Sequence, residues 1–162
     1  MLTDPGAQNR DGRILFVDDD QRILDGIRRR LRGSFDIETA VGPERGLEAM
    51  AGDEQFAIVV ADMNMPGMTG AQFLSIVRDR HPKSVRMMLT GNADVDTATA
   101  AVNDGNVFRY MTKPVTSEEL RRSLDAGFEH RRVIDAMSSL ATKSRPKCVP
   151  SSWPPSASIH AL

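Results

Sequence analysis

The chain has 162 residues, which is enough for one domain with a sizeable core and a tail but too few for two full domains. Its 21 lysine and arginine residues nearly balance 22 aspartate and glutamate residues, so a net charge of −1 gives no case for nucleic acid or an anionic membrane as the main partner. A single cysteine, Cys148, excludes an internal disulfide, residues 1–11 are too polar for a signal peptide, and no apolar run approaches the roughly 20 residues that span a bilayer. We therefore expect a cytoplasmic protein.

Short apolar runs alternate with segments of helical periodicity, a pattern that predicts repeated βα units around a parallel sheet. The predicted strands are Ile14–Val17, Phe35–Ala40, Phe56–Ala61, Val85–Leu89 and Val107–Met111. The predicted helices run from Ile23 to Leu31, from Pro43 to Gly52, from Thr69 to His81, from about Asp94 to Asp104, and from Thr116 to about Leu140. Because crossovers between parallel strands are right-handed, helices should cover both faces, which makes the predicted fold a doubly wound α/β domain with five strands and five helices.

Four segments are expected along the chain. Residues 1–12 form a disordered N-terminus, 13–130 a globular domain, 131–142 a helical extension, and 143–162 a Pro/Ser-rich disordered tail in which Trp153 is solvated. The extension places Val133, Met137 and Leu140 on one stripe, but it is shorter than three heptads, so pairing of two copies into a homodimer stays open.

Polar residues follow four of the predicted strands directly. Asp62 ends one strand, the run Asp18–Asp20 follows another, and Thr90 and Lys113 follow two more. Because the carboxyl ends of parallel strands share one edge of the sheet, where α/β folds bind ligands, these side chains should form one site. The competing interpretation of loop aspartates as solvated or capping residues does not explain why all of them follow strands.

The residue types at this edge suit phosphoryl transfer. A carboxylate such as Asp62 can attack phosphorus as a nucleophile and become an aspartyl phosphate. Positive charge must then offset the anionic group, and clustered carboxylates such as Asp18 and Asp19 offer Mg²⁺ the few oxygen ligands that it prefers. Lys113 can place a point charge on one phosphoryl oxygen, and Thr90 can donate a hydrogen bond to another.

Four motifs carry a family resemblance: Ile-Leu-Phe-Val-Asp-Asp-Asp ending at Asp20, Asp-x-x-Met-Pro-Gly-Met-x-Gly starting at Asp62, Leu-Thr-Gly around Thr90, and Tyr-x-x-Lys-Pro ending at Pro114. Over residues 13 to about 130 the chain resembles the response-regulator receiver domain of two-component signal transduction. The run 105–115 is most similar to receivers found with HD-GYP outputs or in hybrid kinases. The resemblance implies the flavodoxin-like strand order 2-1-3-4-5.

The resemblance also assigns roles. It implies that Asp62 is the phosphoacceptor and that Asp18 and Asp19 form an acidic pocket, with Asp19 a direct Mg²⁺ ligand and the carbonyl of Asn64 another. Asp20 occupies a position that varies in the family and receives no role.

A second group of roles concerns the conformational switch. The resemblance implies that Thr90 supplies the switch hydroxyl and that Tyr110 swings inward with it. Lys113 is implied as the phosphate-binding lysine, joined to Pro114 by a cis peptide bond.

The leading interpretation is a stand-alone phosphoacceptor switch. It would receive its phosphoryl group from a histidine kinase or histidine phosphotransfer protein, catalyse at most its own phosphorylation and slow dephosphorylation, and signal by contact with an effector protein. One alternative is a scaffold that is never phosphorylated. Another is a metal-dependent phosphatase, which would need a general acid where this chain has Asn64. His130, on the terminal helix, is interpreted as a surface residue rather than a phosphorelay histidine.

Overall fold

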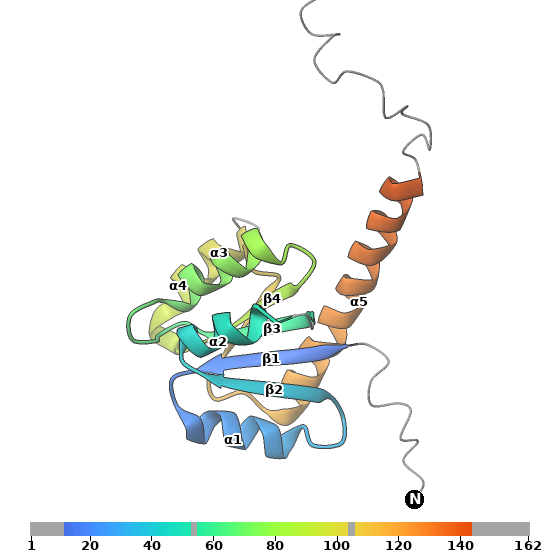
Figure 1. The fold of residues 1–162 in the computed structure, drawn as a ribbon. Helices are drawn as coiled ribbons and strands as arrows, with labels where there is room; N and C mark the ends of the chain where they lie inside the picture. Colours follow the sequence, from blue (N-terminus) through green and yellow to red (C-terminus); the bar gives the residue numbers. More distant parts are fainter. Residues whose placement is uncertain (1–11, 53–54, 104–105, 144–162) are drawn as a thin grey trace, which may run out of the picture.

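The computed structural model describes residues 12–52, 55–103 and 106–143, and these form a parallel five-stranded sheet with helices on both faces (Figure 1). The strand order is β2-β1-β3-β4-β5, which confirms the predicted fold class and order. The strands are β1 (Arg13–Asp18), β2 (Asp36–Val41), β3 (Phe56–Asp62), β4 (Val85–Thr90) and β5 (Arg109–Thr112).

The helices follow the strands as the hydrophobic periodicity predicts. They are α1 (Gln21–Arg30), α2 (Pro43–Met50), α3 (Gly70–Arg80), α4 (Val95–Asn103) and α5 (Ser117–Lys143), with a short 3₁₀ helix, η2 (Asn92–Asp94), before α4. A capping box stands at the start of α3: the Thr69 side chain accepts a hydrogen bond from the backbone of Gln72, and the Gln72 side chain accepts one from the backbone of Thr69.

Most elements begin or end within three residues of the predicted bounds, and two of the differences have a clear physical reason. The apolar run that predicts the last strand begins at Val107, but β5 begins at Arg109, because the Val107 N–H donates to the carbonyl of Ala101 at the end of α4. The fourth helix was expected from Asp94, but the Asp94 N–H bonds three residues back to Gly91, which makes this turn 3₁₀ rather than α.

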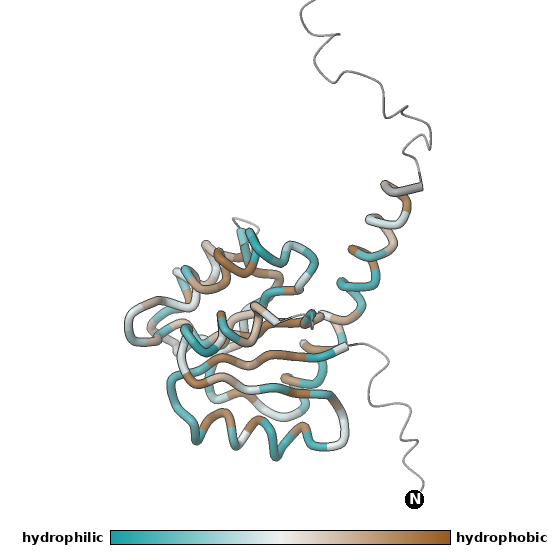
Figure 2. The backbone as a smooth tube through the Cα atoms, in the orientation of Figure 1, coloured by the Kyte–Doolittle hydropathy of each residue, from teal (hydrophilic) through white to brown (hydrophobic). Residues whose placement is uncertain are grey.

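Successive side chains along each strand point to opposite faces of the sheet, which divides the core into two layers. Ile14 and Phe16 of β1 pack with Ile58 and Val60 of β3 against the apolar side chains of α1 and α5, whereas the residues between them pack against α2, α3 and α4. Figure 2 shows the resulting hydrophobic strands between more mixed helices. Asp18 continues the even-numbered series of β1, so its side chain emerges on the α1 and α5 side of the sheet.

The long helix α5 has two unlike halves. Leu120, Leu124 and Phe128 are buried in the core, whereas Val133, Met137 and Leu140 are 53%, 65% and 66% exposed. The second half extends away from the sheet (Figure 1). Among the described residues, the helices are too short or too polar to cross a membrane. Residues 1–11 and 144–162, which hold most of the predicted disordered ends and Trp153, lie outside the described ranges.

Candidate functional site

The carboxylate of Asp62 stands at the end of a strand that is buried along its whole length. The residue is 7% exposed, and its backbone is fixed by close neighbours. The N–H of Met63 donates to the carbonyl of Leu89 at 3.0 Å, and the N–H of Gly70 donates to the carbonyl of Met63 at 2.8 Å. A Cβ atom at Gly70 would overlap the carbonyl oxygen of Asp62, so α3 can begin here only with glycine. The backbone around Asp62 is thus tightly packed at the edge of the sheet.

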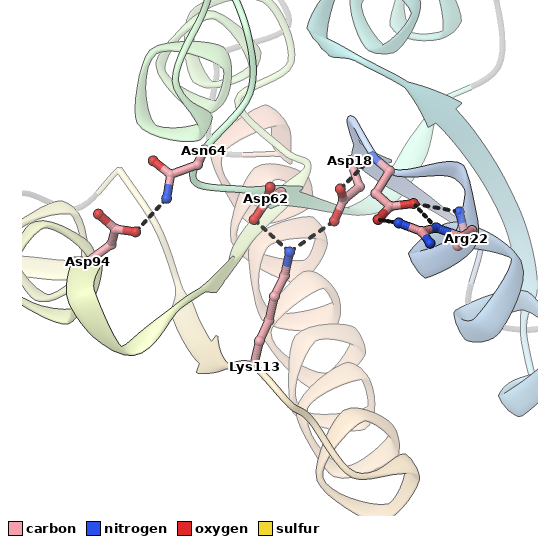
Figure 3. A network of polar contacts seen from close by, with 7 residues as sticks. Asp18, Arg22, Asp62, Asn64, Asp94 and Lys113 are labelled. Carbon is pink, nitrogen blue, oxygen red and sulfur yellow. Dashed lines mark hydrogen bonds and ion pairs between the residues drawn. The ribbon is translucent and has the colours of Figure 1, made fainter.

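Lys113 joins the two buried carboxylates of the site (Figure 3). Its ammonium nitrogen lies 2.9 Å from Oδ1 of Asp62 and 3.1 Å from Oδ2 of Asp18. The backbone N–H of Lys113 donates to the carbonyl of Thr90 at 2.8 Å, which fixes the start of the side chain, and the peptide bond to Pro114 is cis, as expected. The structure therefore brings three of the predicted site residues into direct contact.

Burial and neighbouring charges both shift the pKa values of Asp18 and Lys113. Burial raises the pKa of Asp18, the charge of Asp62 adds to that increase, and the hydrogen bond from the Asp20 N–H and the charge of Lys113 only partly offset it. For Lys113, burial alone would lower the pKa, but hydrogen bonding and attraction to Asp62 and Asp18 outweigh it and raise the pKa. Lys113 is therefore charged at neutral pH and compensates two acids that lie close together.

The three consecutive aspartates after β1 have different roles in the structure. Asp18 is 2% exposed and faces the site, and Asp19 is exposed. Asp20 turns away and caps α1, because its Oδ1 accepts the N–H of Arg22 at 2.9 Å. The position of Asp20 directly before an amphipathic helix is the sequence signal for such a cap.

Oxygen atoms of Asp18, Asp19 and Asp62 lie within 4.8 Å of one another. Hard carboxylate oxygens in this number are the ligands that Mg²⁺ accepts while it keeps several waters. The donor set therefore fits Mg²⁺ chemically. Asn64 lies in the loop after β3 with an exposed side chain, and its backbone carbonyl is the fourth ligand implied by the resemblance.

Thr90 and Tyr110 lie on the other side of the sheet edge. Thr90 is fully buried, and by the alternation of side chains along β4 it lies on the α2–α4 side of the sheet, as Met88 does. Its hydroxyl donates a hydrogen bond to the carbonyl of Gly91 at 3.2 Å. Tyr110 pairs with Met88 in the sheet and is half-buried, with its hydroxyl 3.5 Å from that of Thr99 on α4. Among the described residues, no hydrogen bond links either hydroxyl to Asp62 or Lys113.

A side-chain contact that the sequence does not predict crosses the edge of the site. The amide nitrogen of Asn64 donates to Oδ2 of Asp94, the last residue of η2, at 2.5 Å (Figure 3). The two residues are 30 positions apart, and no sequence spacing indicates their contact.

Comparisons with known proteins agree on one family. Residues 14–125 match the response regulator receiver domain. The hydrogenase transcriptional regulatory protein HoxA of Cupriavidus necator is 33% identical over 107 residues, which is 66% of this chain and 22% of HoxA. The chain spans about a quarter of the length of the curated relatives that it matches.

Solved structures share this fold. A structure described as adenylate cyclase from Rhodopirellula baltica has a TM-score of 0.79 and 34% identity, and the match covers 82% of this chain and 98% of that one. A response regulator receiver domain protein from Clostridium thermocellum has a TM-score of 0.72 and 28% identity, with 76% of this chain and 98% of that one covered.

Proposed function

This chain belongs to the response regulator receiver domain family, and from that premise we propose that it is a signalling switch that accepts a phosphoryl group on Asp62. The observation that carries the proposal is the position of Lys113, whose ammonium group contacts Asp62 and Asp18 together. A cation held beside a nucleophilic carboxylate offsets the charge of an incoming phosphoryl group.

The proposed donor is a phosphorylated histidine on a histidine kinase or histidine phosphotransfer protein. A carboxylate oxygen of Asp62 forms the new bond to phosphorus as the phosphorus–nitrogen bond breaks, and the electron pair of that bond returns to the donor imidazole. Lys113 holds one phosphoryl oxygen. The carboxylate of Asp62 is nearly buried, so only a small group can reach it, which suits a phosphohistidine side chain.

Mg²⁺ is the proposed cofactor, held by Asp19, Asp62 and the backbone carbonyl of Asn64, with Asp18 completing the acidic pocket. When bound, the ion neutralises charge on the carboxylates and the phosphoryl group. The support is the carboxylate cluster, in which burial and the charge of Asp62 raise the pKa of Asp18, because a second cation would relieve that repulsion.

The proposed conformational response to phosphorylation involves Thr90 and Tyr110, on the α2–α4 side of the sheet. We expect Thr90 to turn its hydroxyl from Gly91 towards a phosphoryl oxygen, since it is the last residue of β4, the strand that pairs with the one that carries Asp62. Tyr110, whose hydroxyl is now near Thr99, would follow and change the surface formed by α4, β5 and α5. A downstream effector protein would recognise that surface. We place this exchange in the cytoplasm.

We also propose that the exposed stripe of α5 contacts a second copy of the chain. Val133, Met137 and Leu140 are at least half exposed and lie at helical spacing. Met137→Glu with Leu140→Glu should lower the sedimentation coefficient of the full chain, whereas Ser139→Glu, away from the stripe, should leave it unchanged. A chain that sediments as a monomer before any substitution would contradict this pairing.

Intact-mass measurement tests the central proposal. The chain is incubated with Mg²⁺ and a small acyl phosphate, alongside Asp62→Ala and the matched surface variant Asp25→Ala. One phosphoryl adduct on the wild type and Asp25→Ala, absent from Asp62→Ala and absent without Mg²⁺, is expected. A folded wild type without any adduct, even with candidate kinases, would favour the non-phosphorylated scaffold, and continuous rapid turnover of the donor would favour a phosphatase.

A further inference from the structure

The bridge between Asn64 and Asp94 connects the two loops that flank the acceptor. Asp62 pairs with Leu89 in the sheet, and the Met63 N–H donates to the Leu89 carbonyl, so the loops after β3 and β4 leave the sheet side by side. The amide of Asn64 and the carboxylate of Asp94 join these loops beyond the end of the sheet.

The bridge lies on the outer side of the acceptor. In Figure 3, Asn64 and Asp94 are on the side of Asp62 opposite to Asp18, and Lys113 approaches from below in that view. The side chain of Asn64 is exposed, whereas Asp62 is 7% exposed. The Asn64 side chain therefore stands on a solvent-facing side of Asp62, from which water could approach a phosphoryl group there.

Asp94 restricts the orientation of that amide. A carboxylate is only an acceptor, so it fixes the amide nitrogen of Asn64 towards itself, and the charge strengthens the hydrogen bond. Without Asp94 the amide of an exposed asparagine is free to rotate into solvent. The bridge is thus a device for holding one side chain beside the reacting group.

We propose that Asp94 is a positioning residue that slows loss of the phosphoryl group, because it holds the Asn64 side chain across the solvent side of phosphorylated Asp62. In the loss reaction a water oxygen bonds to phosphorus, the bond between phosphorus and Asp62 breaks, and its electron pair stays on the Asp62 carboxylate. The water protons leave with the phosphate product or to solvent. The inference rests on the proposed function of Asp62.

Four variants separate this role from a structural one. Asp94→Ala removes the acceptor, and Asp94→Asn is the matched control that keeps a carbonyl oxygen for the Asn64 amide. Asn64→Ala removes the amide but leaves the backbone carbonyl that is implied for Mg²⁺. The double variant Asn64→Ala/Asp94→Ala tests whether Asp94 acts through Asn64, since residues that act as one unit give non-additive effects.

The experiment measures the decay of the phosphoryl adduct by intact mass after the donor is removed, with Mg²⁺ present. We expect Asp94→Ala to shorten the lifetime about three- to tenfold, the size of effect that one hydrogen bond supports, with Asp94→Asn within about twofold of wild type. Asn64→Ala and the double variant should decay at the same rate as Asp94→Ala. Melting temperatures should be equal across the series, because the bridge is exposed.

Two kinds of failure are distinguishable. The inference alone is overturned if the wild-type adduct forms and decays at the rate of the Asp94→Ala adduct, or if the Asp94→Ala adduct decays more slowly. It is also overturned if Asp94→Ala shortens the lifetime as much in the Asn64→Ala background as in the wild type. A wild type that never forms the adduct overturns the proposed function and the inference together.

Discussion

The two sides of the sheet edge differ in how firmly their polar groups are held. On the α1 and α5 side, Lys113 contacts Asp18 and Asp62 at once, at 3.1 and 2.9 Å. On the α2–α4 side, the hydroxyl of Thr90 donates to the carbonyl of its neighbour Gly91, and the hydroxyls of Tyr110 and Thr99 are 3.5 Å apart, at the limit of hydrogen-bond distance. We call these the fixed half, which we propose binds the phosphoryl group, and the adjustable half, which we propose responds to it.

Lys113→Ala should have the largest effect, because it removes the cation from the fixed half. A hydrogen bond between charged groups contributes about 1.5–3 kcal/mol, so we expect phosphorylation of Asp62 to slow by about 10- to 100-fold. The measurement is the initial rate of adduct formation with a small acyl phosphate. Lys83→Ala, an exposed lysine before β4, is the matched control and should react at the wild-type rate. A Lys113→Ala rate within twofold of wild type would remove the distinction between the halves.

Gly70→Ala tests the rigidity of the fixed half. The new Cβ would overlap the Asp62 carbonyl oxygen, so we expect the free energy of unfolding to fall by about 1–3 kcal/mol, as for other overpacked sites. Chemical denaturation measures the change. Gly26→Ala in α1, where a Cβ meets nothing within 4 Å, should instead leave stability equal or higher by up to about 1 kcal/mol. Equal behaviour of the two variants would show that Asp62 can shift freely.

Asp18→Asn tests the electrostatic strain in the fixed half. Burial, with the charge of Asp62, raises the folded-state pKa of Asp18 above its ordinary value of 3.8. The contribution of Asp18 to stability is therefore fully present below that pH and is lost as the pH rises through the raised pKa. The neutral asparagine should therefore raise the melting temperature by a few degrees at pH 7 without Mg²⁺. The advantage should disappear below pH 3.8, where Asp18 is protonated in both states. A variant less stable than wild type at pH 7 would mean that contact with Lys113 dominates.

Thr90→Ala should have the smallest effect on the chemistry and separate the halves most clearly. We expect its phosphorylation rate to stay within about threefold of wild type, because losing one neutral hydrogen bond changes a rate by little. The phosphorylation-induced change in hydrogen exchange of α4 and β5 should be lost. Thr90→Ser keeps the hydroxyl and should retain that change. A strong loss of phosphorylation in Thr90→Ala, with the exchange response intact, would reverse the assignment of the two halves.

The fixed half could be predicted from the sequence and the contacts of the adjustable half could not. Asp18, Asp62 and Lys113 each follow an apolar run, so alternation and the shared edge of a parallel sheet bring them together. The partners of Thr90, and the contact between Asn64 and Asp94, depend on side-chain directions at strand ends and in loops. The spacing of residues along the sequence does not predict those directions. Val107 illustrates the same limit, since its N–H bonds to α4 and not to the sheet.

Position 70 carries a lesson for redesign. No atom of Gly70 beyond its backbone is available to contact a ligand, yet its missing side chain is what allows α3 to start against the Asp62 carbonyl. A designer who grafts Asp18, Asp62 and Lys113 onto another parallel sheet would copy the charged groups but lose the space that lets the next helix begin against Asp62. The minimal portable unit therefore includes an empty volume as well as three charges.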